Sequence, residues 1–379
     1  MSETTARPQR DRSDARDRLR IGIVTEPDAP ESYAERLAAD LPGQLDDASG
    51  WSVEVRLDTV AAGCRDADDV LQRARELRER YGWDHVVCLT DLPVREHHRP
   101  VLAIVDVEDG GAAVSVPALG ALASYRRALQ LVVRVLDELR HDDAADVAEP
   151  SDTTDGRQGR AAQLLAPVVR TTGTCRDGHA AVRFLSTRRR GMAWLLVGMV
   201  RSNRPWRIAA GLKGALVAAL AASVFGLSST TIWMLADAAS WWRVLLAASG
   251  VAAVMVGWLV FHHDLWESRR RGAVDRQQAV LYNASTLISL LVGVATLYAA
   301  LLAVNLAIAA VLLPPDVLSD QLGTDVGVRT YLALAWGFAS MGLVAGALGS
   351  GFETDAAVRR AAYGYREQQR RDRGDEQDG

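Results

Sequence analysis

The sequence predicts two parts: a three-layer α/β domain with a mixed sheet in the N-terminal half, and an all-α bundle of four transmembrane helices in the C-terminal half. Three observations carry this prediction. Short β-branched runs alternate with helix-periodic stretches across residues 19–141. Four later apolar runs are each long enough to cross the ~30 Å hydrocarbon core of a bilayer. Arginine is dense in alternate loops between these runs and sparse in the others.

The elements of the α/β domain follow one another in the order β-α-β-α-β-β-β-α. The strand at 51–57 alternates apolar and polar residues, as a half-buried strand does, whereas the strand at 85–89 is apolar throughout. Asp109-Gly110-Gly111 predicts a hairpin turn. The first three strands are expected to be parallel and joined by right-handed crossovers. Strands are predicted at 20–24, 51–57, 85–89, 101–107 and 112–116, and helices at 31–45, 66–81 and 124–140.

Polar segments flank and separate the predicted domains. Residues 1–18 are charged and contain no apolar run, which predicts disorder and argues against a cleaved signal peptide. Residues 142–166 are acidic and polar and predict a linker. Residues 167–207 predict a juxtamembrane segment, with a hairpin around Asp177-Gly178 and a short helix that lies on the inner leaflet. Residues 353–379 predict a basic and polar cytosolic tail.

Arginine placement predicts the orientation of the transmembrane domain, 208–352. Arginines cluster before the first span, in the second loop and after the fourth span, whereas the first and third loops hold only Arg243 and Arg329. Because positive residues stay on the cytoplasmic side, we expect a multi-pass protein of the inner (plasma) membrane with both termini in the cytoplasm. Buried helices of a soluble protein would not produce this alternation. The spans are predicted at about 208–235, 244–266, 285–314 and 330–352.

Arginines and tryptophans near the span ends predict contacts with the membrane interface. Tryptophan prefers the headgroup level, and arginine attracts the anionic lipids of the inner leaflet. We therefore expect the bilayer itself to be a partner of this chain. The predicted anchors are Arg188, Arg189, Arg190, Trp206, Arg207, Trp241, Trp242, Trp266, Arg269, Arg270 and Arg271.

Small residues recur at helical spacing in the first and fourth spans. Such faces let backbones approach closely, which is how helices associate in lipid. The pattern leaves open whether the packing is within one chain or between the copies of a homo-oligomer. The predicted packing residues are Gly214, Ala218, Ala222 and Gly226 in the first span, and Gly342, Gly346 and Ser350 in the fourth.

Few polar residues interrupt the spans. Asn305 lies in the third span and is expected to form a hydrogen bond between helices. Lys213 lies about one turn inside the first span, where its long side chain can reach the lipid phosphates. A transport pathway usually contains charged residues, so a transporter or channel subunit is disfavoured. That interpretation stays open, because a pore can assemble from several chains.

Composition and motifs exclude several classes of function. The net charge of −4 does not indicate nucleic-acid binding. Cys64, Cys88 and Cys175 all precede the first span and share no CxxC spacing, which predicts reduced thiols in a cytosolic domain. The sequence contains no Walker, GxGxxG, GxSxG or HExxH motif, so it identifies no catalytic residue, metal ligand or cofactor.

Polar residues follow two strands that are expected to be parallel. Thr25 and Glu26 come after the first strand, and Thr90 and Asp91 come after the third. Ligands of open α/β sheets bind at this carboxyl edge. Two carboxylates and two hydroxyls there predict a site for a metal or for the hydroxyl groups of a ligand. The competing interpretation is ordinary capping and turn chemistry beside the prolines that follow each strand.

Five short segments carry a resemblance to known proteins: residues 87–93, 116–120, 198–207, 346–353 and 361–365. With these segments the chain resembles uncharacterised multi-pass membrane proteins of high-GC actinobacteria that have an N-terminal cytosolic α/β domain. The resemblance implies the same two-part architecture and brings no known activity, so it supplies no site residues.

These observations favour a membrane-tethered regulatory module whose α/β domain binds a small molecule or a protein. A complete soluble domain joined to a bundle without a charged pathway is the basis for this hypothesis. Two alternatives remain: a transporter or channel subunit, and a membrane-anchored enzyme that uses Glu26 and Asp91. The enzyme hypothesis requires both carboxylates to lie at the same end of the sheet.

Overall fold

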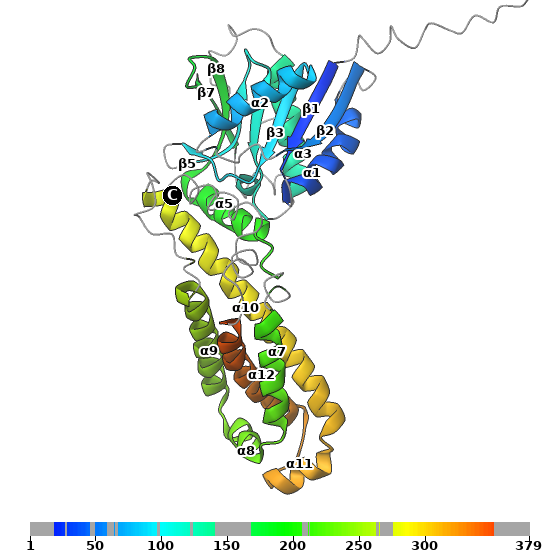
Figure 1. Ribbon diagram of the computed structural model, residues 1–379, viewed down its shortest axis with the longest axis vertical. Coiled ribbons are helices and arrows are strands. Elements are labelled where there is room, and N and C mark those ends of the chain that lie inside the picture. Colours follow the sequence, from blue (N-terminus) through cyan, green and yellow to red (C-terminus); the bar gives the residue numbers. More distant parts are fainter. Residues whose placement is uncertain are drawn as a thin grey trace, which may run out of the picture. The chain divides into compact units, whose positions relative to one another are not determined.

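A computed structural model of the chain divides into two compact units between Ser202 and Asn203 (Figure 1). We call them the α/β domain and the helical region. The predicted N-terminal segment (1–18), linker (142–166) and tail (353–379) lie outside the described residues. The structure describes residues 19–26, 29–45, 50–58, 64, 67–96, 99–121, 124–140, 168–206, 211, 213–262, 265 and 276–351.

The α/β domain is built on one mixed sheet with the strand order β2-β1-β3-β6-β5-β8-β7, and β4 pairs with β5. Strands β2, β1, β3 and β6 are parallel, whereas β5, β8 and β7 are antiparallel to their neighbours. The predicted mixed sheet with its first three strands parallel is therefore confirmed. The strands are β1 Leu19–Thr25, β2 Trp51–Leu57, β3 His85–Thr90, β4 Arg95–Glu96, β5 Arg99–Asp106, β6 Gly111–Ser115, β7 Val168–Thr174 and β8 Ala180–Ser186.

Helices cover both faces of the sheet. Helix α2 (Ala67–Tyr81) packs on one face, where its apolar residues join Val24, Val86 and Cys88 in one core cluster. Helices α1 (Ala29–Asp40) and α3 (Ser124–Arg140) contact each other and lie on the opposite face (Figure 1). Strand β1 lies between β2 and β3 in the sheet, so the connection from β1 to β2 and the connection from β2 to β3 run in opposite directions across it. Helix α1 belongs to the first connection and α2 to the second. Right-handed crossovers in opposite directions put the two helices on opposite faces of the sheet.

The α/β domain continues past residue 141, where the sequence suggested that it ends. The hairpin expected around Asp177-Gly178 forms, and its strand β8 pairs with β5 inside the sheet. Strand β5 is buried along almost its whole length and needs a partner on both edges, which explains why the chain returns after the polar segment. Helix α5 (Arg188–Ser202) then packs on the domain, with Gly198 against the Pro117 carbonyl of the short helix η4 (Pro117–Leu119).

Among its described residues, the helical region contains three helices that are long and apolar enough to cross a membrane. They are α9 (Trp241–His262), residues Ala279–Leu312 of α10 (Arg276–Leu312), and α12 (Val328–Ser350). These helices agree with a membrane protein. A fourth span exists only if α7 (Lys213–Leu227) and α8 (Thr230–Ala238), which are bent by 90° to each other, count as one. A short helix, α11 (Pro315–Leu322), joins α10 to α12.

The first predicted span is thus broken rather than continuous. Ser229 has an extended backbone, and the amides of Ser228 and Ser229 bond back three residues to the carbonyls of Phe225 and Gly226. Serine and threonine hydroxyls compete with helical hydrogen bonding, so the Ser228–Thr231 run is a suitable place for a helix to end. Four spans with both termini in the cytoplasm remain a prediction.

Candidate functional site

The predicted residues at the carboxyl edge of the sheet are brought together. Strands β1 and β3 are parallel neighbours, with Thr25 paired to Leu89, so both strands end at the same edge. Glu26 Oε2 accepts the backbone N–H of Asp91 at 3.3 Å. This edge is also a point where the strand order reverses, since β1 lies between β2 and β3. The two carboxylates therefore meet the geometric condition of the enzyme hypothesis.

The contacts of the two threonines nevertheless fit turn chemistry. Thr25 Oγ1 donates to the Glu26 carbonyl at 3.2 Å, and Thr90 Oγ1 accepts the Leu92 N–H at 3.1 Å. Thr25, Glu26 and Thr90 are at most 1% exposed. These hydroxyls form local hydrogen bonds in a closed part of the fold, so ligand binding by the four residues stays a prediction without further support.

A network of charged side chains lies near the opposite edge of the sheet. Arg75 of α2 reaches Asp106 Oδ2 at 3.3 Å and Asp177 Oδ2 at 3.4 Å, and it also contacts Asp109. His179 Nδ1 lies 3.0 Å from Asp109 Oδ2. These contacts join α2, the end of β5 and the β7–β8 turn.

Ligand atoms of Asp106, Asp109 and His179 lie within 4.8 Å of one another, a spacing that a metal site also has. The Arg75 guanidinium already supplies positive charge to both carboxylates, so the arrangement is an ion-pair network. Partial burial lowers the pKa of His179, but Asp106, Asp109 and Glu108 raise it more, and the net pKa is raised. Local sequence patterns do not predict this cluster, because Arg75, Asp106 and His179 are far apart in the chain.

The three cysteines are free thiols. Burial raises the pKa of Cys88, and burial with nearby carboxylates raises the pKa of Cys175 to about 11. Thiols with raised pKa values remain protonated and are poor nucleophiles and poor metal ligands. Neither buried cysteine is therefore a candidate catalytic residue.

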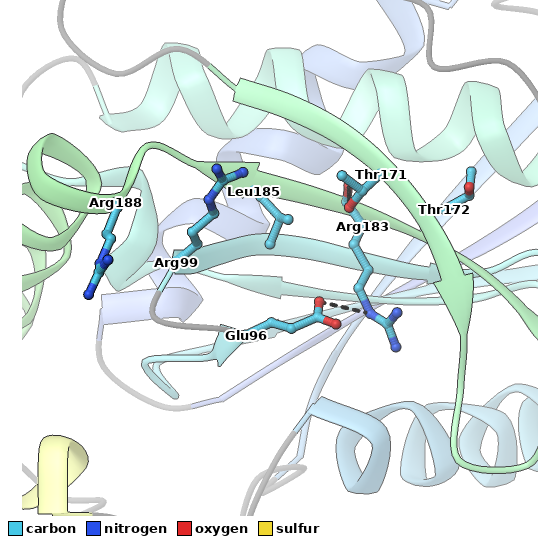
Figure 2. Close-up of a pocket in the computed structure, with 7 residues that line it drawn as sticks. All are labelled: Glu96, Arg99, Thr171, Thr172, Arg183, Leu185 and Arg188. Carbon is cyan, nitrogen blue, oxygen red and sulfur yellow. Dashed lines mark hydrogen bonds and ion pairs between the residues drawn. The ribbon is translucent and has the colours of Figure 1, made fainter.

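An open groove of about 500 Å³ lies over the antiparallel end of the sheet (Figure 2). Its lining comes from β4, β5, β7, β8 and the first residue of α5. Figure 2 shows Arg183 turned towards Glu96, with Arg99 and Arg188 at the other end of the view. We call this feature the arginine groove; it is lined by Glu96, Arg99, Thr171, Thr172, Arg183, Leu185 and Arg188.

Arg183 is fixed in the arginine groove. Its Nε lies 3.3 Å from Glu96 Oε2, and its Nη2 donates to the Thr174 carbonyl at 2.7 Å. Its guanidinium crosses Gly173, where a Cβ atom would lie only 2.2 Å from Nη1. Local sequence patterns do not predict the groove. Its one sign in the sequence is the Arg188–Arg190 cluster, which by itself predicts a lipid anchor.

Predicted anchor residues within the described chain are mostly exposed. Arg188, Arg189 and Arg190 are exposed in the first turn of α5, and Trp206, Trp241 and Trp242 are all more than half exposed. Exposed tryptophans suit a lipid interface, whereas contact with lipid remains a prediction. The other predicted anchors lie outside the described residues: Arg207, Trp266, Arg269, Arg270 and Arg271.

The small residues of α12 lie against α7 within one chain. A Cβ atom at Gly342 would lie 2.7 Å from the Ala219 carbonyl, and one at Gly346 would lie 3.0 Å from the Ala215 carbonyl. Ser350 is also buried. The buried stripe of α7 is Ala215, Ala219, Ser223 and Gly226, whereas the expected Gly214, Ala218 and Ala222 are half-buried beside it. The spacing of small residues along a helix does not by itself predict which face of that helix contacts its neighbour.

Asn305 joins three helices through hydrogen bonds. Its side chain is fully buried, and Nδ2 donates to Ser223 Oγ of α7 at 3.1 Å and to the Leu301 carbonyl at 2.8 Å. Ser223 Oγ in turn donates to the Phe338 carbonyl of α12 at 3.3 Å. Asn305 Oδ1 has no hydrogen-bond partner among the described residues.

No protein-family model, no curated protein and no solved structure matches this chain. What the sites can do is therefore judged from their own geometry and chemistry.

Proposed function

We propose that this chain is a membrane-tethered regulatory module whose cytosolic α/β domain binds a small ligand or a protein. The observation that carries the proposal is the arginine groove. Its volume of about 500 Å³ is within the usual range of small-molecule sites. Its lining residues come from four strands of one sheet and from the neighbouring helix α5. Such rigid elements hold binding groups in fixed positions.

The helical region supports the role of a tether. Its buried polar side chains, among the described residues, are all neutral. Pathways for charged substrates usually contain acidic, basic or histidine side chains inside the membrane. These neutral residues are Ser223, Ser285, Thr286, Ser289, Asn305, Thr330 and Ser350.

The test uses the full chain in detergent, because the α/β domain has not been shown to fold alone. Thermal unfolding is measured against nucleotides, phosphorylated metabolites, divalent metals and other common metabolites, and a pull-down is made in parallel. A ligand at 100 times its Kd stabilises the folded state by about 2.7 kcal/mol. We expect a stabilising ligand or a captured protein whose binding is lost in Arg99→Gln. A chain that binds neither would contradict the proposal.

The predicted orientation has its own test. A fluorescent protein that matures only in the cytoplasm is fused to either end of the chain. Fluorescence from both fusions is expected if both termini are cytoplasmic. A dark fusion at one end would imply an odd number of spans, which is the outcome if α7 and α8 do not cross together.

A second candidate function, a transporter or channel subunit, is favoured by two observations. The α7–α8 break and the unpartnered Asn305 Oδ1 are features that broken-helix transporters use near their substrate. Flux across proteoliposomes that is lost in Asn305→Ala and retained in Thr296→Ala would favour it. Thr296 is a matched control, since it lies exposed on the same helix. Equal flux in both variants and the wild type would count against this role for Asn305.

A further inference from the structure

We infer that the arginine groove binds a phosphate group, supplied either by a soluble phosphorylated compound or by a lipid headgroup. This inference rests on the proposed function, because it names the ligand class of the same site. It differs from the predicted anchor role of Arg188, since the site is a defined groove on the sheet and not a general attraction to the bilayer.

The charge of the groove indicates an anionic ligand. Three arginines line it, and Glu96 is its one carboxylate. Glu96 pairs with Arg183. Arg99 and Arg188 are exposed, and no carboxylate of the described chain forms an ion pair with either. The lining therefore has an excess of two positive charges, which matches the charge of about −1.5 to −2 on a phosphate monoester at neutral pH.

The chemistry of the lining suits an oxyanion such as phosphate rather than a halide, and the excess of two positive charges favours phosphate over a single carboxylate. Guanidinium groups present planar forks that bind phosphate oxygens in pairs, and threonine hydroxyls can donate further hydrogen bonds. Thr171 and Thr172 both line the groove. Thr171 Oγ1 donates to the Arg183 carbonyl at 3.4 Å, so a ligand would compete with that long hydrogen bond. A volume of about 500 Å³ exceeds what one phosphate needs, so the organic part of the ligand fits alongside Leu185.

Arg183 is pre-organised for binding. Glu96 and the Thr174 carbonyl hold its guanidinium, and the missing side chain of Gly173 provides the space that it occupies. A side chain fixed before binding loses less entropy when a ligand arrives. Gly173 is thus a positioning residue for Arg183.

The start of α5 adds a second reason for an anion at this place. Arg188, Arg189 and Arg190 occupy the first turn of a 15-residue helix, where the positive end of the helix dipole makes basic side chains unfavourable. A phosphate beside Arg188 would offset both the dipole and the arginine charges.

The experiment measures the binding of inorganic phosphate by titration calorimetry to the full chain in dodecyl maltoside, a detergent that contains no phosphate. Arg99→Gln and Arg188→Gln remove exposed lining charges. Arg189→Gln makes the same charge change at the next position, outside the lining, and is the matched control. We expect each lining variant to weaken phosphate binding at least about tenfold, the usual loss for one charge-assisted contact, and the control to bind as the wild type does. Gly173→Ala should also weaken binding, with the fold checked by circular dichroism.

A second arm identifies the source of the phosphate. The wild-type titration is repeated in nanodiscs that contain phosphatidic acid, and in nanodiscs of equal charge that contain oleate, which has no phosphate. Weaker phosphate binding with phosphatidic acid than with oleate means that the lipid headgroup occupies the groove. Equal binding in the two means that the ligand is soluble. Either result supports the shared chemistry.

Two results would overturn the inference. Wild-type protein that binds no phosphate in the phosphate-free detergent is one, and equal binding by the wild type and all the lining variants is the other. The outcomes also separate this inference from the proposed function. If phosphate does not bind, but another compound binds to the wild type and not to Arg99→Gln, the proposed binding function is supported and only the assignment of phosphate as the ligand is wrong.

Discussion

The α/β domain and the helical region bury different kinds of polar group. Glu26 and Asp106 of the α/β domain are carboxylates with at most 2% exposure, and they meet backbone amides or Arg75 at the edges of the sheet. The polar groups that the described part of the helical region buries are neutral: hydroxyls, one amide and the indole N–H groups of Trp233 and Trp336. A domain in water can bury a charge where backbone amides or an arginine compensate it. A charge buried among apolar helices costs more free energy than the packing of those helices provides.

The two regions also use glycine differently. In the α/β domain, Gly22 of β1 lies under the Trp83 ring, so the missing side chain admits a large apolar one. In the helical region, Gly342 and Gly346 face carbonyl groups of α7, so the missing side chains admit a backbone. Burial of large apolar side chains stabilises a fold in water, but lipid is as apolar as leucine, and close backbone contact is what favours association there.

The largest expected effect tests the backbone contact between α7 and α12. Gly342→Leu places a side chain where even a Cβ atom would lie 2.7 Å from the Ala219 carbonyl. Overpacking usually lowers the free energy of unfolding by about 1–3 kcal/mol, and we expect a decrease near or above the top of that range. Gly250→Leu on α9 is the control, because nothing lies within 4 Å of its Cβ position. Thermal unfolding in detergent compares the two. Equal midpoints would contradict the close packing.

The corresponding test in the α/β domain is Gly22→Ala. The added methyl group would lie 2.1 Å from the Trp83 ring, which must move out of the core. We expect a loss of about 1–3 kcal/mol. Gly43→Ala, where nothing lies within 4 Å, should change stability little. Circular dichroism at rising denaturant concentration measures both, and a neutral Gly22→Ala would show that the ring is not held against β1.

A smaller effect is expected for the neutral polar contact in the helical region. Asn305→Ala removes the hydrogen bond to Ser223, and such bonds between membrane helices contribute about 0.6 kcal/mol on average and at most about 1.7 kcal/mol. Ser223→Ala should lower the free energy of unfolding by a similar amount. The double variant should lower it by less than the sum of the two single decreases, because the two changes remove one shared hydrogen bond. Additive losses in thermal unfolding would indicate that the pair is not coupled.

The smallest effect concerns the pH dependence of the α/β domain. The raised pKa of His179 means that its ion pairs with Asp106, Asp109 and Glu108 stabilise the fold fully below the unfolded pKa of about 6.5. This contribution is lost as the pH rises through the folded pKa. Arg75 competes for the same carboxylates and limits the effect.

His179→Gln should therefore lower the unfolding temperature more in mildly acidic buffer than in mildly alkaline buffer. Thermal scans of the wild type and the variant across that pH range measure the difference. An equal loss at all pH values would mean that His179 contributes only packing.

Much of the architecture could be predicted from local sequence patterns. Alternation and β-branched runs located β1, β2, β3, β5 and β6, and apolar runs located α9, α10 and α12. The placement of Glu26 and Asp91 at one edge also followed, because two right-handed crossovers leave β1 and β3 parallel.

The sequence by itself therefore determined which segments are strands and helices, and that one half is mainly polar and the other apolar, since periodicity and hydropathy act over a few neighbouring residues. Only the tertiary structure decided that β8 completes the sheet beside β5, that the first apolar run bends at Ser229, and that Arg99, Arg183 and Arg188 share one groove. These features depend on contacts between segments that are far apart in the chain. A local sequence pattern does not predict which distant segment a strand or helix will contact.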